Sequence, residues 1–221
     1  MADIRRSSPE PPPGPPQIQL TPGLGEQTLR ELAPLLAEEG IDVDNIDVPD
    51  LDTLQAALNR AVERHNMTRF TPIGQARALA VTTLRLVIEA LADSDTTQAA
   101  AILAQVQPDS PDNTAATVAA CIGVALGLLD DWLSGAGPHA PDDLGRRMHL
   151  PAGHWRGERA ATDILVLARK GRAFSSLDTL IARQGGEHVL YGSALTLAAA
   201  THTWAACTDT PVRDIARAAV R

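Results

Sequence analysis

Aromatic residues, lysine and cysteine are scarce in this sequence, and each shortage narrows the range of structures that it can form. Aromatic residues make up only 3% of the 221 residues, whereas alanine and leucine are abundant. Strands favour aromatic and β-branched residues, while alanine and leucine are among the best helix formers. The composition therefore predicts a helical protein rather than a sheet protein.

Lysine is almost absent, since Lys170 is the only one among 19 basic residues. The others are arginines, and alanine is the commonest residue of all, which is typical of a genome rich in G and C. We interpret the arginines mainly as this coding bias. We expect the source to be a high-GC bacterium, such as an actinobacterium.

The two cysteines, Cys121 and Cys207, lie far apart in apolar helical surroundings. We expect both to be buried small side chains rather than a disulfide or a metal pair, with a single bridge as the alternative. The N-terminus has no apolar core of a signal peptide. The charge-free stretch 115–129 is shorter than the ~20 residues that a bilayer needs. We therefore predict a cytoplasmic protein without a membrane span.

The first 24 residues contain seven prolines and almost nothing apolar to bury. Such a segment is typical of a disordered or polyproline II arm. We interpret residues 1–24 as a tether, and docking of its prolines on a partner's aromatic groove as the alternative. The predicted globular domain is 25–221.

Apolar residues at three- and four-residue spacing predict helices through this domain. The predicted helices span 25–39, 50–66, 72–92, 95–106, 110–133, 158–169, 176–183, 187–207 and a segment after Thr210. The fold class is therefore all-α, a single globular bundle of about seven to nine helices.

Two of these helices carry almost no charge, near 115–129 and 189–207, and we expect them to lie side by side in the core. Ser110 is the predicted N-cap of the first, with Pro111 at its first position. Gly123 and Gly127 in that helix fit a close approach of neighbouring helices. Residues 79–133 and 158–207 share an order of helix, short helix and uncharged helix. A weak duplication explains that order, and chance similarity between alanine-rich helices explains it as well.

The charge is uneven along the chain. Residues 1–145 contain 8 basic and 21 acidic side chains, a net charge of −13, whereas 146–221 contain 11 basic and 6 acidic, a net charge of +5. This asymmetry indicates either a surface for an anionic partner or two halves that attract each other in one fold. We favour mutual attraction.

The best candidate for a ligand site is the connection 139–158 between two predicted helices, because it concentrates histidine and arginine. Its candidate residues are His139, Arg146, Arg147, His149, His154, Arg156 and Glu158. Imidazoles and a carboxylate can bind zinc or iron, but their spacing matches no compact metal motif, so no metal site is predicted. The arginines suit a phosphate or a nucleic-acid backbone. A solvated surface loop explains the same residues.

Other candidates are weaker. The acidic segment 42–52 lacks the glycine and glutamate of a calcium loop. Asp130 and Asp131 suggest a magnesium pair, but the third acid of that pattern is replaced by Ser134. His202 and Tyr191 lie on the second uncharged helix, where we expect hydrogen-bonded core residues rather than a general base.

No motif for a nucleophile, a phosphate-binding glycine loop or a CxxC pair is present, so we predict no catalytic residue, metal or cofactor. By elimination, we expect a non-enzymatic protein that works through contacts with a protein partner or with a second copy of itself. The alternative is a metal- or ligand-dependent enzyme or binding protein that uses the 139–158 loop. Regulation of nucleic acid by the basic C-terminal half is a third, disfavoured hypothesis, because the acidic remainder repels nucleic acid.

Overall fold

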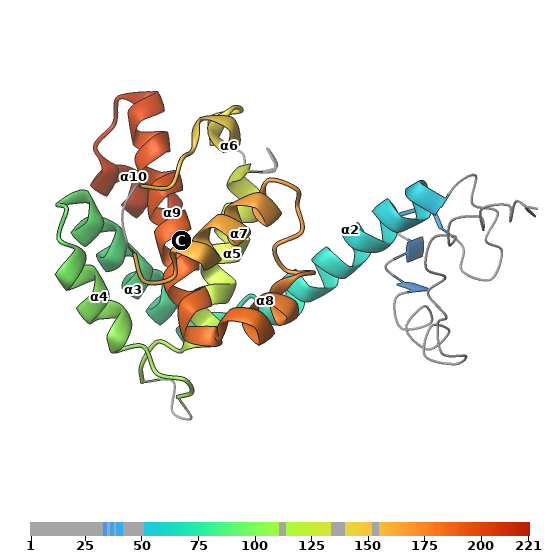
Figure 1. The fold of residues 1–221 in the computed structure, drawn as a ribbon, viewed down its shortest axis with the longest axis horizontal. Coiled ribbons are helices and arrows are strands. Elements are labelled where there is room, and N and C mark those ends of the chain that lie inside the picture. The colour runs from blue at the N-terminus through green and yellow to red at the C-terminus, as the bar shows by residue number, and fades with distance from the viewer. Residues whose placement is uncertain are drawn as a thin grey trace, which may run out of the picture.

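The computed structural model describes residues 33–34, 36–37, 39–41, 51–110, 114–133, 140–151 and 155–221. Within these ranges the chain forms nine helices and no strand, which confirms the predicted all-α bundle (Figure 1). The helices are α2 (Leu51–Phe70), α3 (Gly74–Ala92), α4 (Thr96–Ala104), α5 (Val118–Leu133), α6 (Leu144–Arg147), α7 (Glu158–Ala168), α8 (Leu177–Gln184), α9 (Gly186–Thr208) and α10 (Val212–Ala219). The predicted arm 1–24 lies outside the described residues.

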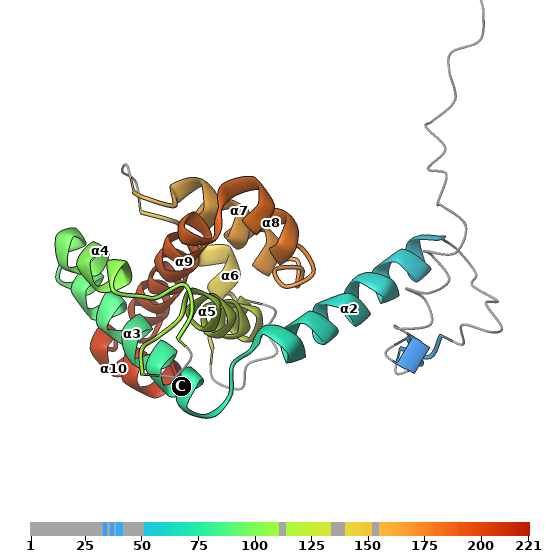
Figure 2. The same cartoon turned by 90° about the horizontal axis from the view of Figure 1, so that it is seen from below.

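The centre of the bundle is the pair α5 and α9, which pack against each other as predicted. Every residue of α9 from 189 to 201 is buried, and so is every residue of α5 from 120 to 126. Trp132 of α5 meets Trp204 of α9 edge to face, with ring centroids 5.2 Å apart. Helices α3 and α4 lie on one side of the pair, and α7 and α8 lie on the other (Figure 2). A helix that is apolar on all faces is stable in water only when neighbours cover it, and these helices do so.

Glycines allow two of the closest helix contacts. A Cβ atom at Gly192 of α9 would lie 2.6 Å from Cβ of Ala160 in α7. A Cβ atom at Gly123 of α5 would lie 2.1 Å from the carbonyl oxygen of Phe70. At Gly127 the nearest atom would be Oγ1 of Thr71 at 3.7 Å, which is ordinary contact. The predicted close approach is therefore confirmed at Gly123 and wrong at Gly127.

Helix α5 begins eight residues later than the predicted Ser110. The backbone of Gln107 accepts from N–H of Val118 at 2.8 Å and donates to the carbonyl of Ala116 at 3.0 Å, which holds that segment out of the helix. The hydroxyl of Thr117 accepts from N–H of Ala120 at 3.2 Å and caps the first turn. The Ser110 hydroxyl accepts from N–H of Thr114 instead. Pro111 lies outside the described residues.

Two other boundaries differ from the predictions. Helix α2 continues to Phe70 instead of ending at residue 66. Helix α3 begins at Gly74 instead of residue 72, and Ile73 occupies its N-cap position with 85% of its surface exposed.

The long connection after α5 contains a short helix, α6, that the sequence pattern did not predict. Leu144 and Met148 at its two ends are fully buried. The Arg169 guanidinium of the segment after α7 donates to the carbonyls of Gly145 and Met148, both at 2.7 Å. These contacts fasten the connection to the bundle, so this part of it is not a loosely solvated loop.

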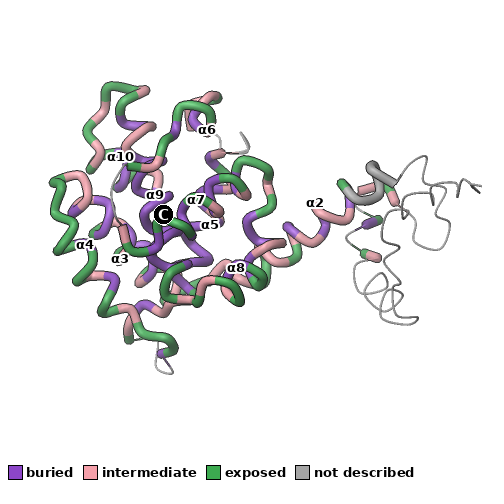
Figure 3. The backbone as a smooth tube through the Cα atoms, viewed as in Figure 1, coloured by how far each residue is buried: buried purple, intermediate pink, exposed green. Residues whose placement is uncertain are grey.

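Helix α2 extends away from the bundle and contacts it only through its C-terminal half (Figure 3). Both carboxylate oxygens of the buried Glu63 accept backbone N–H groups, from Phe174 at 2.7 Å and from Ser175 at 2.6 Å. Asn66 Nδ2 donates to the carbonyl of Phe174 at 3.0 Å. These bonds anchor α2 on the segment that precedes α8.

Helix α10 closes the other end of the fold against α3 and α9. Its Arg213 forms an ion pair of 2.6 Å with Asp93, which joins the basic and acidic halves of the chain. Both cysteines are free thiols; Cys121 is buried as predicted, whereas Cys207 is half-buried. None of the helices among the described residues is long and apolar enough to cross a membrane.

Candidate ligand groove along α9

One stripe of α9 lines a chain of three adjoining cavities, which we call the α9 groove. The middle cavity has a volume of about 350 Å³. It shares His149, His202 and Thr203 with an open cavity of about 450 Å³ at one end. It shares Leu91, Trp155 and Leu195 with a cavity of about 200 Å³ at the other end. Because neighbouring cavities share lining residues, the three lie next to one another along α9.

The floor of the groove follows the helical repeat of α9. The lining residues of α9 are Tyr191, Ala194, Leu195, Ala198, Ala199, His202, Thr203, Ala206 and Cys207. Steps of three and four residues place them on one face of a helix. The remaining faces of α9 pack mainly against α5 and α7, and over shorter stretches against α3, α6, α8 and α10. The same helix therefore belongs to the packed core and also borders the cavities.

Two segments form the walls. The C-terminal end of α3 and the start of α4 contribute Leu91, Ser94 and Thr96. His149 and Pro151, which follow α6, and Trp155, which precedes α7, form the other wall. Asp95 caps α4 by accepting N–H of Gln98 at 2.8 Å, so the first of these walls is a fixed turn between two helices.

His202 and Thr203 are the polar groups of the floor. Burial lowers the pKa of His202 below its ordinary value, because a partly desolvated imidazole loses hydration when it is charged. His202 is therefore a neutral imidazole at pH 7, able to donate and to accept. The Thr203 hydroxyl donates to the carbonyl of Ala199 at 2.8 Å and is thus engaged within its own helix.

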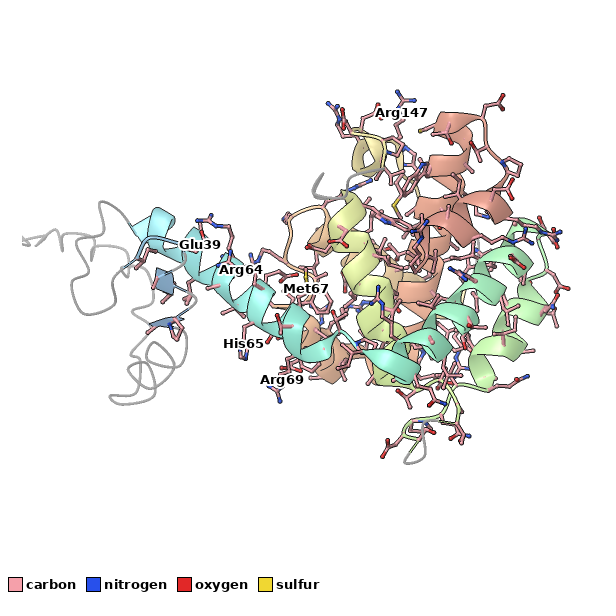
Figure 4. All side chains as sticks on the ribbon, turned by 180° about the vertical axis from the view of Figure 1, so that it is seen from behind. Glu39, Arg64, His65, Met67, Arg69 and Arg147 are labelled. Carbon is pink, nitrogen blue, oxygen red and sulfur yellow. The ribbon has the colours of Figure 1, made fainter. Side chains whose placement is uncertain are left out.

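The open end of the groove is lined by Arg147, His149, His202 and Cys207. Nε of Arg147 lies 2.5 Å from a carboxylate oxygen of Asp143 one turn earlier, and Nη1 lies 3.9 Å from Sγ of Cys207. Figure 4 shows Arg147 at the upper edge of the bundle. The arginine is thus held over the last turns of α9.

The far end of the groove is apolar apart from Arg156 and Tyr191. The Arg156 guanidinium lies 4.7 Å from the centre of the Tyr191 ring, and its Nη2 lies 2.5 Å from a carboxylate oxygen of Glu187. The Tyr191 hydroxyl donates to the carbonyl of Ala100 at 3.3 Å. Both polar groups already have protein partners, so a ligand at this end meets mainly apolar surface.

The structure brings three of the predicted site residues to one groove, namely Arg147, His149 and Arg156. Arg146 and Glu158 are exposed and do not line it. His139 and His154 lie outside the described residues. Sequence reasoning missed His202 as a site residue, because an uncharged helix predicts burial on all faces. The sequence signal that could have found His202 is its helical spacing from Tyr191, Leu195 and Ala198, which places all four residues on one face of the helix.

The paired acids at the end of α5 are a separate feature. Burial raises the pKa of Asp130 to about 6, and the negative charges of Glu63 and Asp131 add to that rise. Burial also raises the pKa of Asp131. Among the described residues, no group of three or more His, Cys, Asp or Glu side chains is arranged to hold a metal ion.

Comparison of the chain with protein-family models, with curated proteins and with solved structures found no match. We therefore infer a function from the chemistry of the α9 groove, that is, from the residues that line it.

Proposed function

We propose that the protein is a binding protein for an elongated, mostly apolar small molecule, which it holds in the α9 groove. The observation that carries this proposal is the row of three neighbouring cavities along one stripe of a core helix. From Tyr191 to Cys207 that stripe covers 16 steps of the helix, a length of roughly 24 Å at 1.5 Å per residue. A ligand that fills the groove is therefore long rather than round.

The size and chemistry of the groove support a small molecule. The middle cavity of about 350 Å³ falls within the roughly 300–1,000 Å³ that is usual for ligand pockets. Apolar side chains such as Leu91, Leu195 and Ala198 form most of its surface, with a few polar groups among them. Such pockets bind by burial of apolar area and use the polar groups for orientation.

The floor of the groove is rigid, which favours binding without a large rearrangement. Leu195, Ala198 and Ala199 are each at least 93% buried, and they belong to the helix with the most extensive packing in the bundle. A preformed site loses little conformational entropy when a ligand enters. We therefore expect affinity to come from the shape of the groove as it stands.

The two hydroxyl groups that α9 contributes to the groove favour binding over chemistry. Thr203 and Tyr191 donate to backbone carbonyls, so neither hydroxyl is paired with an adjacent base as a nucleophile requires. His202 is a neutral imidazole, but each of these two hydroxyls donates to a backbone carbonyl rather than to His202. The proposal is therefore a binding protein rather than an enzyme.

Calorimetric titration of the full chain with 1-decanol tests this proposal. We expect saturable binding that is lost in Ala199→Leu, because the larger side chain fills the middle cavity. Ala119→Leu is the matched control, since Ala119 is an exposed position of α5 and should leave binding unchanged. Melting of each variant shows that it folds. Failure of the wild type to bind decanol, or equal binding by both variants, would reject the groove as a binding site.

A second candidate is contact with a protein partner or a second copy of the chain through α2. This helix reaches away from the bundle, and His65 and Arg69 on it point outward, while Met67 packs against the core (Figure 4). In the middle of α2, Arg60 donates to Glu39 at 2.8 Å, Arg64 donates to the same carboxylate, and Ala61 forms a small core with Leu36. This arrangement presents a stiff arm to a partner.

Solution mass and a pull-down test this second candidate. A dimer mass for the full chain that returns to the monomer mass in Arg69→Glu would support self-association through α2. Arg159→Glu is the control on an exposed arginine of α7, far from that arm in the fold. A monomer mass at high concentration, together with no captured partner, would count against the arm as an interface.

A further inference from the structure

The two ends of the α9 groove differ in their hydrogen-bond donors, and this difference bears on what the ligand carries. Arg147, His149 and His202 line the open end. At the far end the guanidinium of Arg156 covers the Tyr191 ring, and most of the other lining residues are apolar. Each of the two arginines is paired with one carboxylate outside the lining, Arg147 with Asp143 and Arg156 with Glu187. The open end therefore offers a guanidinium and two imidazoles together, whereas the far end is mainly apolar.

We infer that the ligand is an amphiphile with one anionic head, a carboxylate or a phosphate, which binds against Arg147, His149 and His202. Its apolar tail runs along α9 past Ala199 and Leu195 toward Val87 and Leu103. This inference rests on the proposed function, because it gives the chemistry of the molecule that the groove holds.

The position of Arg147 fits this role. Its Nε lies beside the Asp143 carboxylate, which fixes the guanidinium at the mouth of the groove. Its Nη1 faces Cys207, which belongs to the groove floor. A planar guanidinium with several N–H donors binds carboxylate and phosphate oxygens in a defined direction.

The two imidazoles add donors beside this arginine. A neutral imidazole donates one N–H, and a protonated one donates two. His202 comes from the buried floor and His149 from the wall, so the three donors converge from α9, α6 and the segment after α6. An anionic head placed there receives hydrogen bonds from two sides.

The tail direction follows from the apolar lining of the rest of the groove. Beyond His202 the floor continues through Ala199, Ala198 and Leu195, and the far cavity adds Val87, Ala99 and Leu103. A second charge on the ligand would have to be buried on this surface without a partner, which is costly. One polar head and one uncharged tail therefore match the distribution of donors and apolar surface along the groove.

Calorimetric titrations with decanoate, decyl phosphate and 1-decanol at pH 7.5 and low salt test the inference on the full chain. The three probes share a ten-carbon tail and differ only in the head. We expect at least one anion to bind about tenfold or more tightly than decanol, because hydrogen bonds to a charged group are strong in a partly desolvated site. The tighter of the two anions identifies the head. Added salt should narrow the difference between anion and alcohol.

Two neighbouring arginines provide the matched variants. Arg147→Gln should lower the affinity for the anion to that for decanol and leave decanol binding unchanged. Arg146→Gln should change neither, because Arg146 is exposed and does not line the groove. Asp143→Asn, which removes the negative charge beside Arg147, should raise anion affinity several-fold.

The outcomes separate this inference from the proposed function. Equal binding of decanol and both anions by the wild type, or equal losses in Arg147→Gln and Arg146→Gln, would overturn the anionic head and leave the groove intact. If none of the three probes binds, both the groove and the head are wrong. Selective loss of anion binding in Arg147→Gln supports both.

Discussion

Helices α5 and α9 are alike in sequence, since both are nearly free of charge, but they serve the molecule differently. Helix α5 is buried by α2, α3, α7 and α9. Helix α9 packs against α5, α7 and parts of α3, α6, α8 and α10, and its remaining stripe lines the groove. Its polar residues fall on both sides: Tyr191, His202 and Thr203 line the groove, whereas Ser193, Thr196 and Thr201 are fully buried in the packed faces. An uncharged helix therefore need not be packed on every face, and its polar residues alone do not show which face borders a cavity.

Truncating one leucine in each helix to alanine should give the largest change in the free energy of unfolding, and the change should differ between α5 and α9. Leu129 of α5 is fully buried, so Leu129→Ala should lower the free energy of unfolding by about 2–5 kcal/mol. Leu195 of α9 borders the groove, so Leu195→Ala should cost less, about 1–2 kcal/mol, because part of its surface faces an existing cavity. Urea unfolding measures both. Equal losses would mean that the groove face of α9 is packed as tightly as α5.

A smaller effect separates the glycines of the two helices. Gly192→Ala should destabilise by about 1–3 kcal/mol, because its Cβ would lie 2.6 Å from Cβ of Ala160. Gly127→Ala is the matched control in α5, where the nearest atom lies at 3.7 Å. It should stabilise by up to about 1 kcal/mol through helix propensity. Thermal melting checks both, and a gain in stability for Gly192→Ala would contradict the close contact of α7 and α9.

The smallest expected change in the free energy of unfolding comes from Asp130, near the end of α5. The folded pKa of Asp130 is raised from 3.8 to about 6, so the folded protein binds its proton more tightly than the unfolded chain does. Stability is therefore lost as pH rises from about 4 to about 6. Asp130→Asn should stabilise at pH 7 by about 1 kcal/mol, less than the full shift would give because the carboxyl is half-buried and screened by solvent.

The pH dependence of this variant distinguishes a charge effect from a packing effect. At pH 4 the Asp130 carboxyl is largely protonated in the folded state and nearly half protonated in the unfolded state, so most of the advantage of Asp130→Asn should be lost. Unfolding by urea at pH 4 and at pH 7 measures the change. An equal gain in stability at both pH values would show that burial of the charged Asp130 carboxylate does not destabilise the folded protein.

The sequence predicted the pairing of α5 and α9 because a charge-free helix in water must be covered, whatever covers it. It did not predict the start of α5, because the hydrogen bonds of Gln107 with Ala116 and Val118 join residues that no local pattern connects. Likewise the short helix α6 depends on burial of Leu144 and Met148 by distant elements. Local spacing determines helix type, whereas these exceptions arise from tertiary contacts.

The candidate site was predictable only in part for the same reason. The concentration of arginine and histidine in 139–158 indicated Arg147, His149 and Arg156. His202 lies more than fifty residues later in the chain, and only the fold brings it beside His149 in one cavity. An apolar floor also resembles a core stripe in sequence, since both consist of leucine and alanine at helical spacing.

The most direct test of the account is photo-cross-linking with a decanoate that carries a diazirine at the end of its tail, followed by peptide mapping. The account predicts adducts on the groove stripe of α9 around Leu195 and on the facing wall at Trp155 or Leu103, with α5 unlabelled. Adducts confined to α2 or to the outer surface, or no saturable labelling at all, would contradict it.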